Sequence, residues 1–312
     1  MQASKIGGFG PHFYCPSVSR IQANLLLLVT ALIWGSAFIA QNKGMAAIGP
    51  LLFTGLRFLI GALVVAPLAW REWRQSTHPI TRRDGAKIVG LGLLMLLGAA
   101  LQQIGIQYTS VTNAGFLTAL YVPMVPLLSW LLMKHLPHWS TWPGALACVA
   151  GAWLLAGAQV LEIAPGDYWV AASALPWAFH VLLVGRVAEG MRAPFLVACG
   201  QFLVCGVLAL AGGAMVEPLN WARIDAAMLP LLYAGVLSVG VAFTAQVVAQ
   251  RHAHASDAAI ILSAETVFAA IFGYLLLGER LGPAGIVGCG LILASMLSIQ
   301  VLPLIRPFRA RA

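Results

Sequence analysis

The sequence predicts an all-α integral membrane protein with ten transmembrane helices, arranged as two inverted five-helix repeats. Composition is the first observation behind this prediction: 60% of the 312 residues are hydrophobic and only 9% are charged, and the mean hydropathy is +0.88. That balance is typical of membrane proteins. The second observation is a series of apolar spans separated by short linkers, and the third is an internal repeat.

Ten apolar spans follow one another along the chain, each close to the length that crosses a hydrocarbon layer. They lie at about 22–40, 50–70, 86–107, 112–133, 143–160, 167–185, 193–214, 228–249, 257–278 and 283–304. We therefore expect a tail at 1–20, a first repeat at 21–160, a second repeat at 166–304 and a C-terminal tail at 305–312. The run after Arg20 lacks the small-residue site and polar continuation of a cleaved signal peptide.

Basic residues are distributed unevenly between the two sides of these spans. With the N-terminus in the cytoplasm, the inside segments hold 14 Lys and Arg residues and the outside loops hold 3. The inside set is Lys5, Arg20, Arg71, Arg74, Arg82, Arg83, Lys87, Lys134, Arg186, Arg192, Arg251, Arg306, Arg309 and Arg311, and the outside set is Lys43, Arg223 and Arg280. The positive-inside rule then predicts a multi-pass protein with both termini cytoplasmic. The chain has a net charge of +8. Because apolar spans separate its basic residues, they do not form a solvated binding face, and we expect no nucleic-acid partner.

The second half of the chain repeats the first at an offset of about 144 residues. Ala31-Leu32-Ile33-Trp34 matches Ala174-Leu175-Pro176-Trp177 at an offset of 143, Arg57-Phe58-Leu59 matches Gln201-Phe202-Leu203, and Gln102 matches Gln246. Because each half has five spans, an odd number, the second half must enter the membrane upside down relative to the first. Inverted repeats are an architecture of secondary transporters, whose substrate site lies at the repeat interface near the membrane midplane.

Three motifs in this order resemble the EamA-type drug/metabolite transporter superfamily: Trp34-Gly35-Ser36, Arg57-Phe58, and Glu265 followed by Leu277-Gly278-Glu279. The resemblance extends from about residue 21 to 303. It implies a ten-helix inner-membrane carrier, usually an exporter of amino acids or other small metabolites. The family often has a proline after the glutamate, where this chain has Thr266, so the helix break expected there lacks its proline.

Glu265 is the leading functional candidate. It lies roughly 12 Å along the helix from Asp257 and roughly 21 Å from Glu279 at the α-helical rise, which places it near the middle of the hydrocarbon layer. An intramembrane carboxyl group is costly and is a functional hypothesis by default. Glu265 could exchange a proton as access alternates, or it could be a neutral strut bonded to a neighbouring helix. Its counterpart Tyr121 could offer a hydroxyl to the same cavity or be a packed aromatic residue.

A stripe of small residues runs along the same helix on a different face from Glu265. Their spacing of 4, 3, 4 and 3 residues predicts one face where a neighbouring backbone approaches closely. The stripe consists of Ala259, Ser263, Thr266, Ala270 and Gly273. We interpret this helix as one wall of an internal cavity.

Arg57 and Gln201 occupy equivalent polar positions in the two repeats. Arg57 could hold a substrate carboxylate through two parallel hydrogen bonds. The alternative is an arginine that extends to the outer interface or bonds helix-end carbonyls. An ion pair with Glu265 is possible in this topology but does not follow from it.

Five further side chains complete the candidate substrate or coupling site. Trp34 and Trp177, at equivalent positions, could stack on a substrate or pack in the interior. Gln102 and Gln246 could bind a polar substrate or join helices. His180 could relay protons or be satisfied by a neighbour.

Motifs for enzymes, nucleotides and metals are absent from the sequence. It has no HExxH, no Gly-x-Ser-x-Gly and no Walker lysine, and its five cysteines include no CxxC pair. We therefore expect no enzyme activity, no catalytic residue, no cofactor and no metal. The prediction is a secondary carrier of small molecules in the bilayer, a monomer or homodimer, with proton coupling as a hypothesis. A receptor, scaffold or lipid-handling protein with the same cavity is the alternative.

Overall fold

The computed structural model describes residues 19–76, 79–109, 111–134, 136–156, 164–278 and 280–305, without the side chains of 111–113, 277 and 303–305. Within these ranges the chain is helical and contains no strand. The helices are α1 (Arg20–Met45), α2 (Pro50–Gln75), α3 (Arg82–Ile106), α4 (Val111–Thr118), α5 (Tyr121–Met133), α6 (Thr141–Leu155), α7 (Pro165–Met191), α8 (Pro194–Val216), α9 (Trp221–Ala226), α10 (Met228–Leu232), η1 (Tyr233–Phe243), α11 (Thr244–Ala249), α12 (Ala255–Leu262), α13 (Ala264–Leu277) and α14 (Pro283–Ile305).

The predicted fold class is confirmed. Nine segments of the described chain are long and apolar enough to cross a membrane. The shorter apolar helix α6 lies in the one remaining predicted span, the fifth along the chain. Two of the nine are broken, α4 with α5 and α12 with α13, and a third, α10 with η1 and α11, changes from α-helix to π-helix and back without a break. The described part of α6 ends at Leu155, and residues 157–163, which the fifth predicted span enters, lie outside the described residues.

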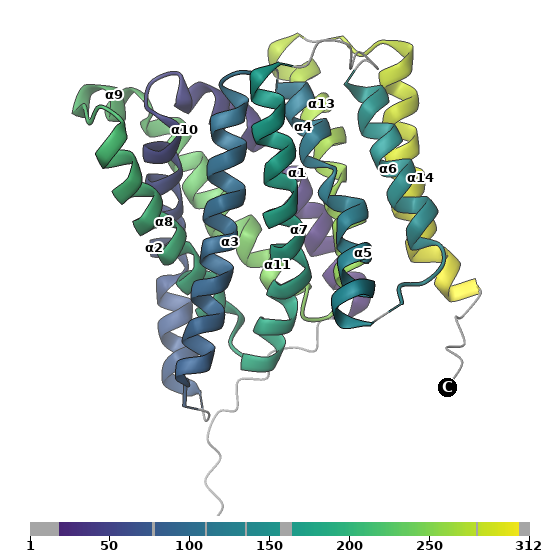
Figure 1. The fold of residues 1–312 in the computed structure, drawn as a ribbon, viewed down its shortest axis with the longest axis horizontal. Coiled ribbons are helices and arrows are strands. Elements are labelled where there is room, and N and C mark those ends of the chain that lie inside the picture. The colour runs from purple at the N-terminus through teal and green to yellow at the C-terminus, as the bar shows by residue number, and fades with distance from the viewer. Residues whose placement is uncertain are drawn as a thin grey trace, which may run out of the picture.

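The helices pack in pairs that join the two halves (Figure 1). α2 lies along α8 and α6 lies along α14, and each of these helices is the repeat equivalent of its partner. α3 packs on α7, and the equivalent pairing of η1 with α1 is present as well. Two-fold symmetry between inverted halves produces this reciprocity. The centre of the bundle, occupied by α1, α7, α11 and α13, is therefore built from both halves (Figure 1).

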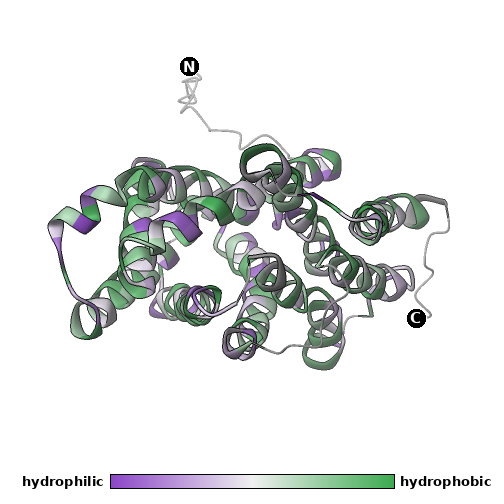
Figure 2. Ribbon diagram, turned by 90° about the horizontal axis from the view of Figure 1, so that it is seen from above, coloured by the Kyte–Doolittle hydropathy of each residue, from purple (hydrophilic) through white to green (hydrophobic). Residues whose placement is uncertain are grey.

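Apolar side chains cover the outside of the bundle as well as its core. Seen from above, hydrophobic ribbon surrounds the outline of the molecule (Figure 2). Leu63, Leu97 and Leu229 are 72%, 53% and 79% exposed. A surface of this kind is stable in lipid, which solvates apolar groups without the cost that water imposes.

A reciprocal pair of glutamates joins the ends of α2 and α8, and the sequence offered no signal for it. The carboxylate of Glu217, at the end of α8, accepts hydrogen bonds from the backbone N–H groups of Leu51 and Leu52, both at 2.8 Å. The carboxylate of Glu72, in the last turn of α2, accepts one from the N–H of Leu196 at 2.8 Å. Each helix thus caps the N-terminus of the other, where unpaired N–H groups favour a negative charge.

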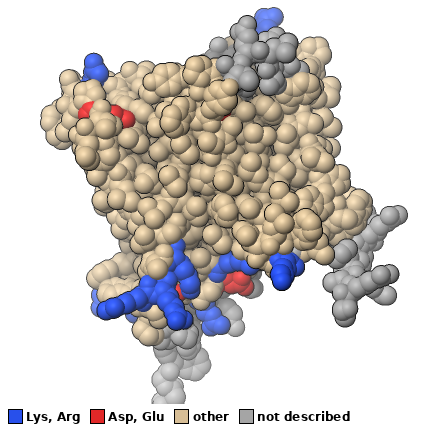
Figure 3. All heavy atoms as spheres, in the orientation of Figure 1, with Lys and Arg blue, Asp and Glu red and all other residues tan. Residues whose placement is uncertain are grey.

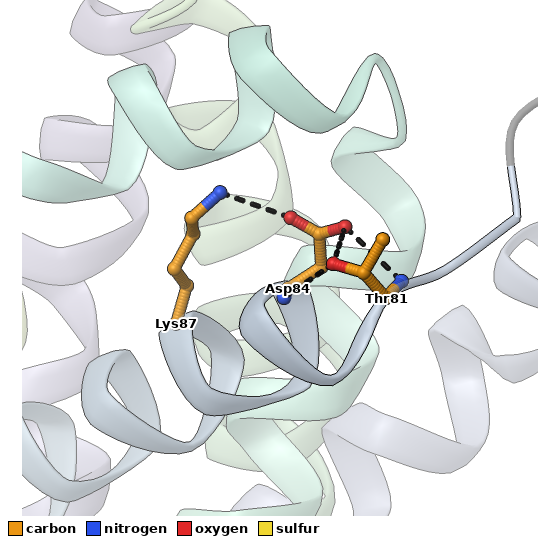
Figure 4. A network of polar contacts seen from close by, with 3 residues as sticks. All are labelled: Thr81, Asp84 and Lys87. Carbon is orange, nitrogen blue, oxygen red and sulfur yellow. Dashed lines mark hydrogen bonds and ion pairs between the residues drawn. The ribbon is translucent and has the colours of Figure 1, made fainter.

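The start of α3 is held by side chains (Figure 4). The hydroxyl of Thr81 accepts a hydrogen bond from the N–H of Asp84 at 3.2 Å and donates one to its carboxylate at 2.7 Å. Lys87 Nζ donates to the same carboxylate at 2.9 Å. This capping box fixes the point at which the chain enters the third span.

Lys and Arg side chains gather at the end of the bundle where α1 begins and α2 ends (Figure 3). Arg20, Arg74 and Lys87 belong to this end, which we call the basic end. Lys43 and Arg223 belong to the opposite end, which we call the far end.

Candidate functional site

A small central cavity of about 60 Å³ lies between the two halves. Seven of the nine predicted site residues line it: Trp34, Arg57, Gln102, Tyr121, Trp177, Gln246 and Glu265. The structure adds six residues that the sequence analysis did not select: Phe38, Gln41, Thr118, Val181, Ser238 and Phe243. The other two predicted residues, Gln201 and His180, do not line this cavity.

Helix breaks at equivalent positions present Glu265 and Tyr121 to the cavity. α12 ends at Leu262 and α13 begins at Ala264, and in the first repeat α4 ends at Thr118 and α5 begins at Tyr121. Glu265 and Tyr121 therefore both lie at the start of the second segment of a broken span. Discontinuous spans of this kind form substrate and ion sites in transporters.

The break before Glu265 forms without the proline that the family often has. Ser263 Oγ donates to the carbonyl of Ile260 at 2.6 Å, and Thr266 Oγ1 donates to the carbonyl of Ser263 at 2.8 Å. These hydroxyl groups satisfy carbonyls near the break. Side chains and neighbouring helices can replace lost backbone bonds in a membrane span, so Thr266 does not remove the break.

Glu265 is 6% exposed. Among the described residues its carboxylate forms no hydrogen bond and no ion pair, so no bond there holds it as a strut. Its place in the first turn of α13 puts it at the positive end of that helix, which favours a negative charge. The Tyr121 hydroxyl makes a long hydrogen bond of 3.5 Å to the carbonyl of Ala259.

Arg57 is buried at 4% exposure and is held by groups that carry no charge. Its Nη1 donates to Gln41 Oε1 at 2.6 Å. Its guanidinium carbon lies 5.7 Å from the ring centroid of Phe53 and 5.2 Å from that of Phe58, and such contacts are favourable for a cation. Within the described residues its Nε has no hydrogen-bond partner. No carboxylate of the described residues lies within ion-pair distance of Arg57, Glu265 included.

Gln201 and His180 form a pair of their own in the second half. His180 Nε2 lies 3.0 Å from Gln201 Oε1, and both side chains are fully buried. The structure therefore places the counterpart of Arg57 in the core, away from the cavity. The repeat identified Arg57 and Gln201 as equivalent polar residues, but it could not show which of the two faces the cavity.

Phe243 is the centre of the aromatic wall, and the sequence analysis missed it. Its ring lies 4.4 Å from that of Trp34 and stacks on that of Trp177 at 5.9 Å and 19°. The indole N–H of Trp34 donates to the carbonyl of Ser238 at 3.2 Å. The indole N–H of Trp177 is buried and has no hydrogen-bond partner in the described part of the chain.

Trp34 bonds to the π-helical segment η1, whereas Trp177 has no such bond to the equivalent helix α3 within the described residues. In a π-helix such as η1, each backbone carbonyl accepts a hydrogen bond from the N–H group five residues later. Two carbonyls of η1 accept side chains of α1: that of Ser238 from Trp34, and that of Ala242 from Thr30 at 3.1 Å. The equivalent helix α3 is α-helical throughout, and its Gly98 lies against the Trp177 ring. No sequence pattern indicated the π-helix.

Two glutamines at equivalent positions differ in their bonding. Gln102 Nε2 donates to Thr118 Oγ1 at 2.8 Å. Gln246 Nε2 donates to Gln250 Oε1 at 2.9 Å, and Gln250 Nε2 donates in turn to the carbonyl of Val181 at 2.8 Å. Gln246 Oε1 is buried and, among the residues that the structure describes, has no hydrogen-bond partner.

The small-residue stripe of span nine faces a helix at one end and a cavity at the other: Ser263 contacts Cys148 of α6, with Oγ 3.3 Å from Sγ. Thr266, Ala270 and Gly273 line a second cavity of about 120 Å³. The close backbone contact lies on the Glu265 face, where a Cβ on Gly35 of α1 would lie 2.6 Å from Phe268 Cβ.

His252, His254 and Asp257 do not assemble as metal ligands. Asp257 instead pairs with Arg20 at 3.1 Å. In the part of the chain that the structure describes, no group of three His, Cys, Asp or Glu side chains could hold a metal ion.

Comparisons with known proteins agree on one family. The sequence pattern of the EamA-like transporter family matches residues 21–157 and again residues 164–300. An uncharacterized transporter of Archaeoglobus fulgidus is 31% identical over 91% of this chain and 87% of its own length. The threonine/homoserine exporter RhtA of Escherichia coli K12 is 22% identical over 87% of this chain and 88% of its own. A solved crystal structure matches 91% of this chain and 98% of its own with a TM-score of 0.75 at 22% identity, which supports the fold.

Proposed function

Because the chain belongs to the EamA-like transporter family, we propose that it is a secondary carrier that exports small zwitterionic metabolites such as amino acids. The protein is a multi-pass membrane transporter, and the proposal concerns its substrate, its direction and its coupling. In this proposal the two halves alternate access to the central cavity.

Unpaired polar groups around the central cavity carry the proposal. In the described chain two buried donors, Arg57 Nε and Trp177 Nε1, and one buried acceptor, Gln246 Oε1, have no hydrogen-bond partner. The Glu265 carboxylate lines the same cavity and is also unbonded within the described residues. A buried polar group without a partner costs free energy, so a ligand that supplies the partners is favoured.

A zwitterion matches these groups. Its carboxylate can accept from Arg57 and Trp177, and its ammonium can donate to Glu265 and Gln246. An apolar or short side chain then contacts the aromatic wall around Phe243. The relative RhtA is named as an exporter of threonine and homoserine, and both are α-amino acids, which supports this substrate class and the outward direction.

Counterflow in proteoliposomes tests the substrate class. Vesicles loaded with unlabelled threonine should accumulate labelled threonine, and excess threonine should inhibit this uptake. N-acetylthreonine lacks the cation and threonine methyl ester lacks the anion, so neither should compete. Equal competition by both analogues would exclude zwitterion recognition, and amino-acid binding without flux would favour the receptor alternative.

Proton coupling by Glu265 is part of the proposal. Glu265→Gln keeps the size of the side chain and removes its titration. Threonine exchange without a pH gradient should therefore persist, and the transport rate in a pH gradient should fall to the rate measured without one. The matched control is Asp225→Asn, at an exposed carboxylate of α9 that lines none of the cavities described for this chain. Undiminished pH-driven transport by a folded Glu265→Gln chain would remove the coupling role.

The orientation in the membrane follows from the charge distribution. The basic end of the bundle (Figure 3) should face the cytoplasm of the inner membrane by the positive-inside rule. Single cysteines at exposed Ser76 and exposed Asp225 test this in intact cells. An impermeant thiol reagent should label Asp225→Cys and leave Ser76→Cys unmodified, and the reverse pattern would invert the assignment.

A further inference from the structure

Two cavities flank the central one. A basic-end cavity of about 720 Å³ is lined by residues that include Arg20 and Arg186, and a far-end cavity of about 120 Å³ is lined by residues that include Lys43. Val181 lines both the central and the basic-end cavities, and Phe38 lines both the central and the far-end cavities. A single side chain is thus shared at each junction.

Phe38 and Val181 are equivalent residues of the two repeats. Each follows its tryptophan, Trp34 or Trp177, by four residues, one helical turn, at the offset of 143 that relates these tryptophans.

The walls of the two outer cavities are equivalent as well. Three more residues of α1 in the far-end cavity correspond at the same offset to residues of α7 in the basic-end cavity: Ile39 to Leu182, Asn42 to Gly185 and Lys43 to Arg186. The correspondence continues at an offset of 144 at the end of the ninth and fourth spans, with Gly273 and Ser129, and just after them, with Leu281 and Pro137. With Phe38 and Val181, six lining positions of the two cavities are therefore equivalent, and these positions form matching walls of two vestibules, one at each end of the bundle.

We propose that Phe38 and Val181 are the far-end and basic-end gates of the transport path, and that this structure is the state opened toward the basic end. The inference rests on the proposed carrier function. The volumes of about 720 Å³ and about 120 Å³ identify the open vestibule. In the opposite state the far-end vestibule widens and the basic-end vestibule contracts.

Helix contacts beside each gate show what must move. At the basic end a Cβ on Gly185 of α7 would lie 2.3 Å from the carbonyl oxygen of Gln250, so α7 meets the end of α11 backbone to backbone. Gln250 also donates to the carbonyl of Val181 at 2.8 Å. At the far end Gly35 of α1, which lines the far-end cavity, lies as close to α13, where a Cβ on it would be 2.7 Å from the backbone nitrogen of Ala269. Opening a gate wider separates the helix pair at that end.

Gln246 joins the substrate groups to the basic-end gate. Its unpaired Oε1 belongs to the central cavity and its Nε2 holds Gln250, which holds the Val181 carbonyl. A substrate ammonium that binds Gln246 therefore acts on the same amide that anchors this gate.

Reaction rates of a cysteine in the central cavity test the gates. The reporter is Ser238→Cys in a full-length chain whose native cysteines are replaced, in vesicles of known sidedness, with an impermeant methanethiosulfonate reagent. The reporter should react faster from the basic end than from the far end. Phe38→Ala should raise the far-end rate about tenfold and change the basic-end rate less than about twofold, since reactivity follows the open population. Val181→Ala should raise the basic-end rate selectively.

Matched substitutions separate a gate from a general loosening. Phe116→Ala widens the far-end cavity without touching the central one, and Val184→Ala truncates a buried valine of α7 that lines none of the three cavities. Both should leave the reporter rates unchanged. Phe38→Leu, a milder change, should raise the far-end rate in the same direction and serves if the alanine variant fails to fold.

The gate assignment would be wrong if the reporter cysteine reacted from the far end at equal rates in Phe38→Ala and Phe116→Ala. It would also be wrong if neither Phe38→Ala nor Val181→Ala changed the reaction rate of the reporter. Threonine counterflow by the unaltered chain would in that case still stand. A chain without threonine counterflow but with side-selective labelling would instead refute the proposed substrate and keep the gates.

Discussion

The two halves of the molecule share one order of helices but differ in the groups they direct to the centre. In the first half Arg57 of α2 bonds Gln41 of α1 and lines the cavity. In the second half Gln201 of α8 bonds His180 of α7 and lies in the core. The same pair of helices is therefore joined by a charged contact in one half and by a neutral one in the other.

The difference extends to the helices themselves. The third span is the continuous helix α3, whereas its counterpart contains the π-helical segment η1. Glu265 stands in the second half where the first has Tyr121. A symmetric scaffold supplies two equivalent vestibules, while a substrate with two unlike ends requires unlike groups in the cavity between them. Substitutions that exchange residues between the halves test this interpretation.

The largest effect is expected when the second half receives the charge of the first. Gln201→Arg buries a guanidinium at a fully buried position whose only hydrogen-bonding partner in the described chain is His180. An uncompensated buried charge costs about 3–5 kcal/mol. Thermal unfolding in detergent should show a large loss of stability, and an unchanged unfolding temperature would mean that this position can reach solvent or a counter-charge.

The reverse exchange should affect substrate more than fold. Arg57→Gln gives the first half the residue of the second and removes a charged donor for the substrate carboxylate. A hydrogen bond to a charged group contributes about 1.5–3 kcal/mol, so the threonine KM should rise about tenfold to about a hundredfold. Arg74→Gln, at the exposed end of the same helix, is the matched control and should leave KM unchanged. An unaltered KM in Arg57→Gln would place the substrate carboxylate elsewhere.

A smaller effect is expected from the glycine that α1 has where α7 has Ala178. A Cβ at Gly35 would lie 2.6 Å from Phe268 Cβ and 2.7 Å from the backbone nitrogen of Ala269. Gly35→Ala should therefore destabilise the protein by about 1–3 kcal/mol through overpacking. Gly90→Ala, where a Cβ would meet nothing within 4 Å, should be neutral or stabilising in the same unfolding assay. Equal behaviour of the two variants would contradict the close contact of α1 with α13.

The smallest effect distinguishes the equivalent tryptophans. Trp34→Phe removes the donor to the Ser238 carbonyl and should cost about 0.5–1.5 kcal/mol of stability. Trp177→Phe has no such bond to lose, so it should lower stability less and weaken threonine binding more. Stability losses of the opposite order would show that the unpaired N–H of Trp177 is not available to a ligand.

Much of the fold and of the central site followed from the order of residues. Span lengths, charge asymmetry and the repeat are properties of the linear chain, so Glu265, Arg57 and the paired tryptophans could be selected without coordinates. The same pattern could not distinguish Arg57 from Gln201. At about 100° per residue, a small rotation of a helix moves a side chain from a cavity to a core, and the packing of neighbouring helices sets that rotation.

The sequence by itself determined the membrane fold, the two repeats and the polar positions at their interface, because these depend on composition and spacing along the chain. Only the tertiary structure decided that Phe243 centres the aromatic wall, that the Glu72 and Glu217 carboxylates cap each other's helices, and that Phe38 and Val181 stand between cavities. Each of these features joins residues far apart in sequence, and the spacing within one span contains no information about the helix that will pack against it.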